Sequence, residues 1–166
     1  EALATANDGL SGSDVESLLN MLRDQRAHHA VISIAEAAIS RGGSSIKTRR
    51  LYAQSLIDTS QLNAAIDHLS ATAITMSLDH GEFPEVMGLL GRAHKQIYAN
   101  DKRPFKPDKS LRLALDFYAD AVRGSIRRAA KKNKVSFDDT VRVEQDVWNG
   151  INVIALQALA EKDKVE

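Results

Sequence analysis

The sequence predicts an all-α fold in which about seven helices pair as antiparallel hairpins and stack into a superhelix. Three observations support this prediction. Apolar residues recur at intervals of three and four, the period of one helical face, in successive segments. Ala and Leu, which favour helices, are abundant, and the 166 residues include only three Pro. Similar helix pairs recur about every 35 residues, which is typical of stacked hairpins.

The first helix is expected close to Ser13. Residues 1–12 are small and polar and show no period, so we interpret them as a leader or flexible N-terminus before one helical domain at residues 13–166. Ser13 and Glu16 match the S-x-x-E capping box, in which the Ser side chain accepts a hydrogen bond from a free N–H of the first turn. The helix should run from there to about residue 25.

Three further helices follow, separated by short polar breaks. The second ends at the glycine stop Gly42–Gly43, and the third starts at the serine cap Ser44–Ser45 and ends near Asp58. The fourth should run to about Leu78. The apolar face of the second helix consists of Val31, Ile34, Ala35 and Ala38. That of the third consists of Tyr52, Ala53, Leu56 and Ile57, and that of the fourth consists of Leu62, Ala65, Ile66, Leu69 and Ala73.

The fifth helix is predicted to begin at Pro84, because the first helical position tolerates a residue without an N–H group. Gly88 and Gly91 lie inside this helix, where each costs about 1 kcal/mol relative to Ala. We therefore expect neighbouring helices to approach it more closely than a Cβ atom would allow.

Two longer helices are predicted after it. Residues 100–108 contain two Pro and no period, which indicates a loop, and Asp108 is a suitable cap for a helix that continues through Gly124 towards Lys132. Residues 134–139 form a break. The apolar face of the last helix is predicted to consist of Val143, Val147, Ile151, Ile154 and Leu159.

The helix pairs form a degenerate repeat. Ala65 superposes on Ala30 at an offset of 35 residues, and Gly91 superposes on Ala53 at an offset of 38. Both offsets lie near the tetratricopeptide period of about 34 residues, with small residues where its two helices touch. A HEAT-like repeat of helix pairs remains the alternative.

Three blocks of the sequence resemble a known family. Leu89–Tyr98 contains G-R-x-x-K, Ala114–Val122 contains two aromatic residues, and Trp148–Leu156 contains G-I-N. In order and spacing they resemble the TRAF-binding, tetratricopeptide-like region of the apoptosis signal-regulating kinases and its prokaryotic relatives. The resemblance covers residues 44–160 and departs in the basic stretch 123–134 and at Glu161, where relatives often have Gly. It implies a helical regulatory module that holds partners or senses a signal, usually beside a separate effector domain.

In the tetratricopeptide register, one side of each first helix lines an inner groove. The residues predicted to line it are Lys47, Arg50, Gln54 and Asp58, then Glu85, Gly88, Arg92, Lys95 and Gln96, with amides from Asn149 and Asn152. Four of these side chains are cationic, which predicts a surface that accepts the carboxylates of an acidic peptide or the phosphates of a ligand. The alternative is that Arg92 and Lys95 are solvated or pair with Glu85 or Asp58.

A second cationic region follows the groove helices. Residues 101–134 carry 11 basic and 4 acidic side chains, although the formal net charge of the chain is zero. Its basic patch comprises Arg123, Arg127, Arg128, Lys131 and Lys132. Like charges four residues apart on a helix repel unless an anion joins them, so nucleic acid, an acidic partner, lipid or the chain's own acidic residues after 134 are candidate counterparts. Few aromatic residues interleave, which disfavours single-strand stacking, and a solvated or internally neutralised face is the ordinary alternative.

The sequence argues against several other functions. The chain has no Cys, which excludes disulfides and thiolate chemistry. Its five His lack metal-ligand spacing, and no nucleophile elbow or Walker motif is present, so we predict no enzyme activity, metal or cofactor. His94 is expected as a packed aromatic residue at a hairpin contact. No apolar run approaches the roughly 20 residues of a membrane span, and we expect a cytoplasmic protein.

These observations lead to three ranked hypotheses. The first is a non-catalytic regulatory or scaffolding module of a larger signalling or defence protein, which binds a protein or an acidic peptide in its concave groove. The second is a sensor domain that binds a nucleotide-like or phosphorylated small ligand through the same cations. The third is nucleic-acid binding through the basic patch.

Overall fold

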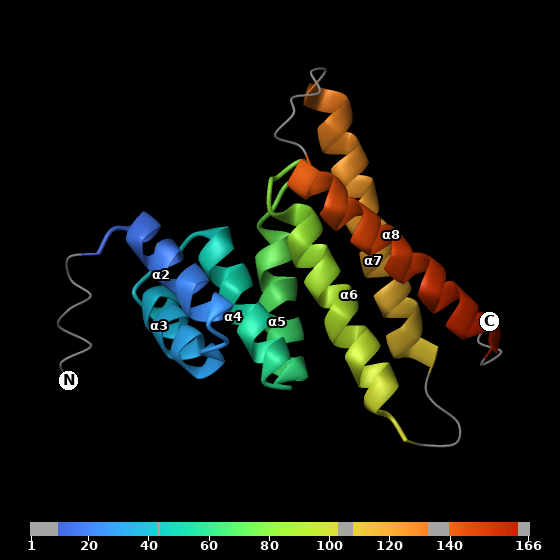
Figure 1. Ribbon diagram of the computed structural model, residues 1–166, viewed down its shortest axis with the longest axis horizontal. Helices are drawn as coiled ribbons and strands as arrows, with labels where there is room; N and C mark the ends of the chain where they lie inside the picture. The colour runs from blue at the N-terminus through green and yellow to red at the C-terminus, as the bar shows by residue number, and fades with distance from the viewer. Residues whose placement is uncertain (1–9, 43, 103–107, 133–139, 163–166) are drawn as a thin grey trace.

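Seven α-helices make up the described part of the chain, which is residues 10–42, 44–102, 108–132 and 140–162 of a computed structural model (Figure 1). These residues contain no strand, which confirms the predicted all-α class. The helices are α2 (Gly12–Asp24), α3 (His28–Ser40), α4 (Ile46–Asp58), α5 (Leu62–Ile74), α6 (Phe83–Asn100), α7 (Asp108–Lys132) and α8 (Thr140–Lys162).

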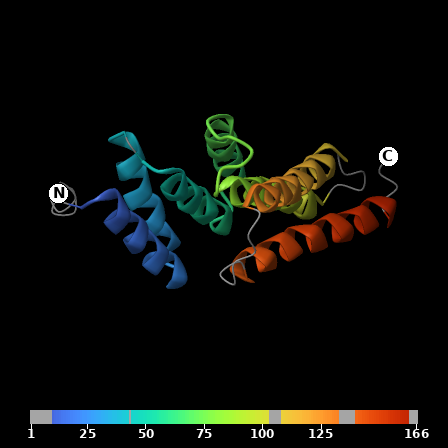
Figure 2. The same cartoon turned by 90° about the horizontal axis from the view of Figure 1, so that it is seen from above.

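The helices pair as hairpins, α2 with α3, α4 with α5 and α6 with α7, and the hairpins lie side by side, with α2 and α3 at one end of the stack and α8 at the other (Figures 1 and 2). Helix α8 packs on both α6 and α7. The first helices of successive hairpins also touch, α2 with α4, α4 with α6 and α6 with α8. We call the surface formed by these four first helices the inner face.

The first two hairpins repeat with a period of 34 residues. Helices α2 and α4 are each 13 residues long and follow the caps Ser11 and Ser45, whose side chains accept the N–H of the residue three positions later. Helices α3 and α5 start at residues 28 and 62. In this register Ala65 is equivalent to Val31, and both residues are fully buried. The predicted superposition of Ala65 on Ala30 is therefore wrong by one residue.

Helix α2 begins slightly earlier than predicted, because Ser11 caps it in place of Ser13. The Ser11 side chain accepts the N–H of Asp14, and the Asp14 carboxylate accepts the N–H of Ser11 at 3.0 Å, which completes a capping box. The Ser13 hydroxyl is engaged with the Ser11 hydroxyl at 2.7 Å. Glu16, predicted as the other half of the box, instead accepts a hydrogen bond from Ser45 of the next hairpin. Residues 1–9 of the predicted leader lie outside the described residues.

Helix α5 ends at Ile74, before the predicted Leu78. The N–H groups of Thr75 and Met76 bond back to the carbonyls three residues earlier, which tightens the last turn and closes the helix. Leu78 lies in the following turn with half of its surface exposed. Helix α7 runs through Gly124 to residue 132, and the predicted break at 134–139 lies outside the described residues.

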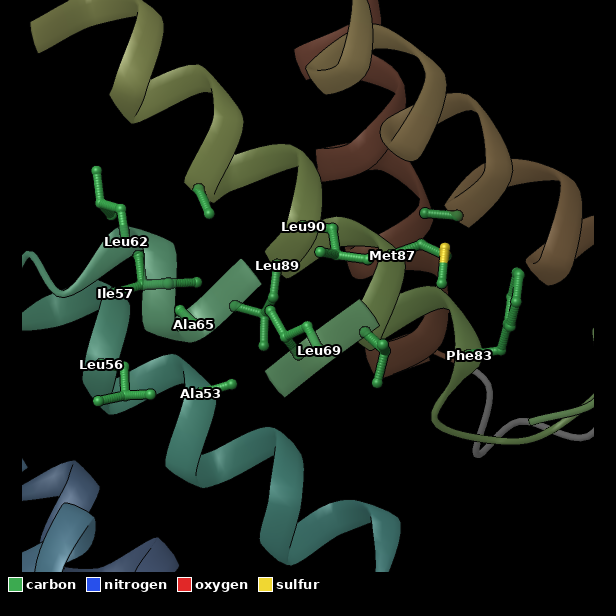
Figure 3. Packing of buried hydrophobic residues seen from close by; sticks show 13 residues of the cluster. Ala53, Leu56, Ile57, Leu62, Ala65, Leu69, Phe83, Met87, Leu89 and Leu90 are labelled. Carbon is green, nitrogen blue, oxygen red and sulfur yellow. The ribbon is translucent and has the colours of Figure 1, made fainter. Parts of the chain in front are cut away.

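The largest core cluster joins α4, α5 and α6, whose apolar side chains point towards one another in Figure 3. Beside it, glycines admit side chains from neighbouring helices. A Cβ atom on Gly91 would lie 2.9 Å from the Tyr118 ring, and one on Gly124 would lie 2.6 Å from the Phe83 ring. A Cβ atom on Gly88 would lie 2.9 Å from the Asn149 Oδ1 atom. The predicted close approach at Gly88 and Gly91 is therefore confirmed.

The predicted apolar face of α8 is largely wrong. Ile151 and Ile154 are 58% and 68% exposed, whereas Asn149, Asn152 and Leu156 are buried. Helix α8 turns the two amides towards Gly88 and Lys95 of α6, and its apolar contacts with α6 and α7 come from Val153, Leu156, Leu159 and Ala160. The side chains of Val143 and Val147 lie outside the described residues, and Leu159 is half-buried as expected. Across the described helices, none has the length and apolar character needed to span a membrane.

Candidate ligand-binding site on the inner face

A pocket of about 230 Å³ opens on the inner face where α4, α6 and α8 meet. Its lining residues are Gln54 of α4, Glu85, Gly88, Leu89 and Arg92 of α6, and Trp148 of α8. The α6 residues recur every three or four positions, so one face of that helix supplies most of the wall. The pocket therefore combines an aromatic ring, an amide and charges of both signs.

An aromatic and cationic cluster flanks the pocket. The Trp148 ring meets the Tyr118 ring edge-on, with 5.6 Å between centroids. The Lys95 ammonium lies 5.8 Å from the Tyr118 ring centroid and 5.9 Å from that of Trp148, and it donates a hydrogen bond to the Asn152 Oδ1 atom at 2.6 Å. Burial, followed by the nearby charge of Arg92, lowers the pKa of Lys95. Lys95 is thus a partly buried cation that contacts two rings and an amide.

The other predicted groove cations are neutralised within the chain. The pairs join Lys47 to Glu16 at 3.4 Å, Arg50 to Glu82 at 2.6 Å, and Arg92 to Asp58 at 2.5 Å. Each pair links one first helix to a neighbouring hairpin or turn. This corrects the prediction of an open surface of four cations and confirms the alternative in which Arg92 pairs with Asp58. Among the described residues, Lys95 is the groove cation without an acidic partner.

Two polar groups at the site are held in unfavourable surroundings. Burial raises the pKa of the Glu85 carboxyl, and the positive charge of Arg50 only partly offsets this effect. Asn149 is fully buried against Gly88, and neither of its side-chain polar atoms has a hydrogen-bond partner within the described residues. A buried amide without partners costs about 1–3 kcal/mol. A carboxyl whose pKa is shifted by burial in a cleft is a common feature of functional sites.

The comparison with known proteins identifies this architecture. A model of the family described as Tetratricopeptide Repeats-Sensor matches residues 27–157, which is most of the chain. The chain belongs to this family. No curated protein and no solved structure matches it. The family supports the tetratricopeptide part of the predicted resemblance, whereas TRAF binding stays a prediction.

In this Tetratricopeptide Repeats-Sensor chain, the predicted site residues divide into two groups. Gln54 and Arg92 line the pocket, and Lys95, Asn149 and Asn152 stand beside it. Lys47, Arg50 and Gln96 do not line it. The sequence prediction missed Trp148 and Tyr118. The only Trp of the chain directly precedes Asn149, and this adjacency was the available signal.

The basic patch of the sensor chain lies away from the pocket, on α7. Arg123 pairs with Asp120 at 2.6 Å, and the Arg128 guanidinium donates to the Gly81 carbonyl. Arg127 is exposed. The side chains of Lys131 and Lys132 lie outside the described residues.

Two of the five histidines, His68 and His94, pack against aromatic rings. The His94 ring stacks on Phe117 at 5.5 Å between centroids, which confirms the predicted hairpin contact, and the His68 ring meets Tyr52 edge-on. Burial lowers the pKa of both His68 and His94, so the neutral rings are favoured. Within the described residues, no group of three or more His, Asp or Glu is arranged to hold a metal ion.

Proposed function

We propose that this chain is a non-catalytic regulatory sensor whose inner-face pocket binds a compact ligand carrying one flat group and one anionic group. A nucleotide-like or phosphorylated molecule has this chemistry. The observation that carries the proposal is the position of Lys95, a partly buried cation beside the pocket that contacts Asn152 and two rings and lacks an acidic partner in the described part of the chain. The family name, which includes the word Sensor, agrees with this function.

The chemistry of binding follows from the pocket residues. A flat group can stack on Trp148, a residue that is 40% exposed and whose ring contacts that of Tyr118. An anionic group can then reach Lys95, where it would replace the neutral oxygen of Asn152 with a full negative charge. Glu85 can accept hydrogen bonds from donors on the ligand. Together these contacts select for shape, charge and hydrogen bonding.

Binding at this position offers a mechanism of signalling. The pocket walls come from three successive hairpins, so a bound ligand would join α4, α6 and α8. Helix α8 packs against α6 partly through the Asn149 amide, which has no hydrogen-bond partner within the described residues, so added contacts can change this packing. We infer that ligand binding favours one position of α8 and that an attached effector or partner responds to it.

Calorimetry with adenosine monophosphate and with inorganic phosphate tests the proposal. We expect the nucleotide to bind more tightly than phosphate, because only the nucleotide can stack on Trp148. Lys95→Met keeps the aliphatic stem and should weaken nucleotide binding about tenfold or more, a loss of about 1.4 kcal/mol for each factor of ten. Lys109→Met removes an exposed cation of α7 and serves as the matched control. Equal nucleotide affinity in wild type, Lys95→Met and Trp148→Ala would contradict the proposal.

A second candidate is a protein or acidic peptide bound along the inner face, because the pairs of Lys47 and Arg50 extend the polar surface beyond the pocket. A synthetic Glu-rich peptide distinguishes the two functions. Peptide binding that is lost in Lys47→Ala with Arg50→Ala, yet retained in Lys95→Met, would favour the second candidate. A cytoplasmic location and attachment to a signalling effector remain predictions in both cases.

A further inference from the structure

A second hollow of about 350 Å³ lies on α7, separate from the inner-face pocket. Its apolar walls are Leu78 from the turn after α5, Phe83 at the start of α6, and Ile126 of α7. The Phe83 ring packs on Gly124, where a Cβ atom would lie only 2.6 Å away. None of these residues lines the inner-face pocket. We call this hollow the α7 groove.

The α7 groove exposes apolar side chains that have no cover in the described part of the chain. Leu78 is 50% exposed and Ile126 is 63% exposed, although both border the same hollow. Paired aliphatic side chains around a concave apolar floor are typical of protein interaction sites. The hollow has room for one or two aliphatic side chains of a partner.

The rim of the α7 groove is basic. Arg127 is exposed and has no ion pair among the described residues, and Arg123 is 70% exposed in its pair with Asp120. An exposed pair of this kind contributes less than about 1 kcal/mol, so Arg123 can exchange its partner at little cost. The Arg128 guanidinium donates to the Gly81 carbonyl and thereby ties α7 to the turn that carries Leu78. The α7 groove is thus stabilised by the contact between Arg128 and Gly81, and its rim carries the positive charges of Arg123 and Arg127.

We propose that the α7 groove binds an amphipathic acidic helix of a partner protein, with aliphatic residues in the hollow and Asp or Glu side chains on Arg123 and Arg127. Helices that bind in grooves place apolar anchors at intervals of three and four, and flanking charges provide specificity. Nucleic acid fits less well, because phosphates would leave Leu78 and Ile126 uncovered. This proposal is independent of the ligand in the inner-face pocket.

Selection from a displayed library of random helical peptides on the immobilised chain tests the proposal. We expect enriched peptides to combine aliphatic residues three and four apart with flanking Asp or Glu. Fluorescence anisotropy should then show that Ile126→Asp and Arg127→Glu each weaken their binding about tenfold or more. The control for Ile126 is Ile154→Asp on α8, which changes a side chain of similar exposure, 68% against 63%. The control for Arg127 is Lys109→Glu on the same helix α7.

Other outcomes would overturn the proposal. They include no enrichment, enriched peptides without acidic residues, and affinities that Ile126→Asp leaves unchanged while circular dichroism shows a folded chain. Self-association in sedimentation that Ile126→Asp abolishes would assign the groove to a second copy. Binding to duplex DNA or to phosphatidylserine vesicles that Arg127→Glu abolishes, without a selected peptide, would assign it to nucleic acid or lipid. Each result is distinct from failure of nucleotide binding at Lys95.

Discussion

Asn149 of α8 lies so close to Gly88 of α6 that a Cβ atom on Gly88 would come within 2.9 Å of the Asn149 Oδ1 atom. This contact joins residues far apart in the sequence and sets how closely α8 approaches α6. Gly88 lines the inner-face pocket, and the residue before Asn149 is Trp148, which lines the same pocket from α8. The width of the pocket therefore depends on the glycine.

Gly88→Ala should destabilise the chain and alter the shape of the inner-face pocket. The added methyl group overpacks the contact at a cost of about 1–3 kcal/mol, and the gain in helix propensity offsets about 1 kcal/mol. We expect a net loss of about 1 kcal/mol in the free energy of unfolding, measured with urea. The double variant with Asn149→Ala should recover this loss, because it removes both the clash and an amide without partners. Gly150→Ala, which has open space around it, should stabilise α8 and is the control.

Gly91→Ala should cost more than Gly88→Ala. Three atoms of the Tyr118 ring lie 2.9–3.0 Å from the position of the added Cβ atom, and Tyr118 is fully buried. A buried ring cannot rotate away as an amide can, so the helices must separate. We expect the free energy of unfolding to fall by about 2 kcal/mol. Unchanged or increased stability in urea unfolding would show that α6 and α7 are packed less closely than described.

The position of the N-terminal cap can be tested with two serine variants. Ser11→Ala removes the side-chain acceptor of the Asp14 N–H but keeps the backbone N–H of position 11 that donates to Asp14, and it should lower the free energy of unfolding by about 1 kcal/mol. Ser13→Ala removes only an exposed hydroxyl contact and should change it by less than about 0.5 kcal/mol. A larger loss of stability in Ser13→Ala than in Ser11→Ala, measured by thermal unfolding, would show that Ser13 is the cap.

Glu85→Gln should stabilise the chain at neutral pH. Burial raises the pKa of Glu85 in the folded state above its ordinary value of 4.5, so ionisation opposes folding once the pH exceeds the unfolded value. Gln removes this penalty, and we expect the melting temperature at pH 7 to rise by about 2 °C. The difference should vanish below about pH 4, where the carboxyl is protonated in both states. A lower melting temperature at pH 7 would mean that Arg50 compensates the buried charge.

Most of the helices were predictable from the sequence. Apolar spacing, the cap at Ser45 and the proline at position 84 act within a few residues, so they are legible without knowledge of the fold. The exact period of 34 residues was missed at Ala30, because the sequence comparison aligned alanine with alanine, whereas the helix starts at residues 28 and 62 align Val31 with Ala65. Gly88 and Gly91 predicted that neighbouring helices approach closely, although the sequence could not identify Asn149 and Tyr118 as the residues in contact.

The composition of the site depended on tertiary packing. Arg92 lines the inner-face pocket as predicted from its helix position, whereas Arg50 does not, and their partners Asp58 and Glu82 come from segments that lie far from them in the sequence. The sequence alone determined which segments become helices and roughly which sides carry charge. Only the packing of those helices decided that Lys95 stays without an acidic partner and that α8 buries amides while exposing isoleucines, because burial and pairing depend on the distances between segments far apart in the chain.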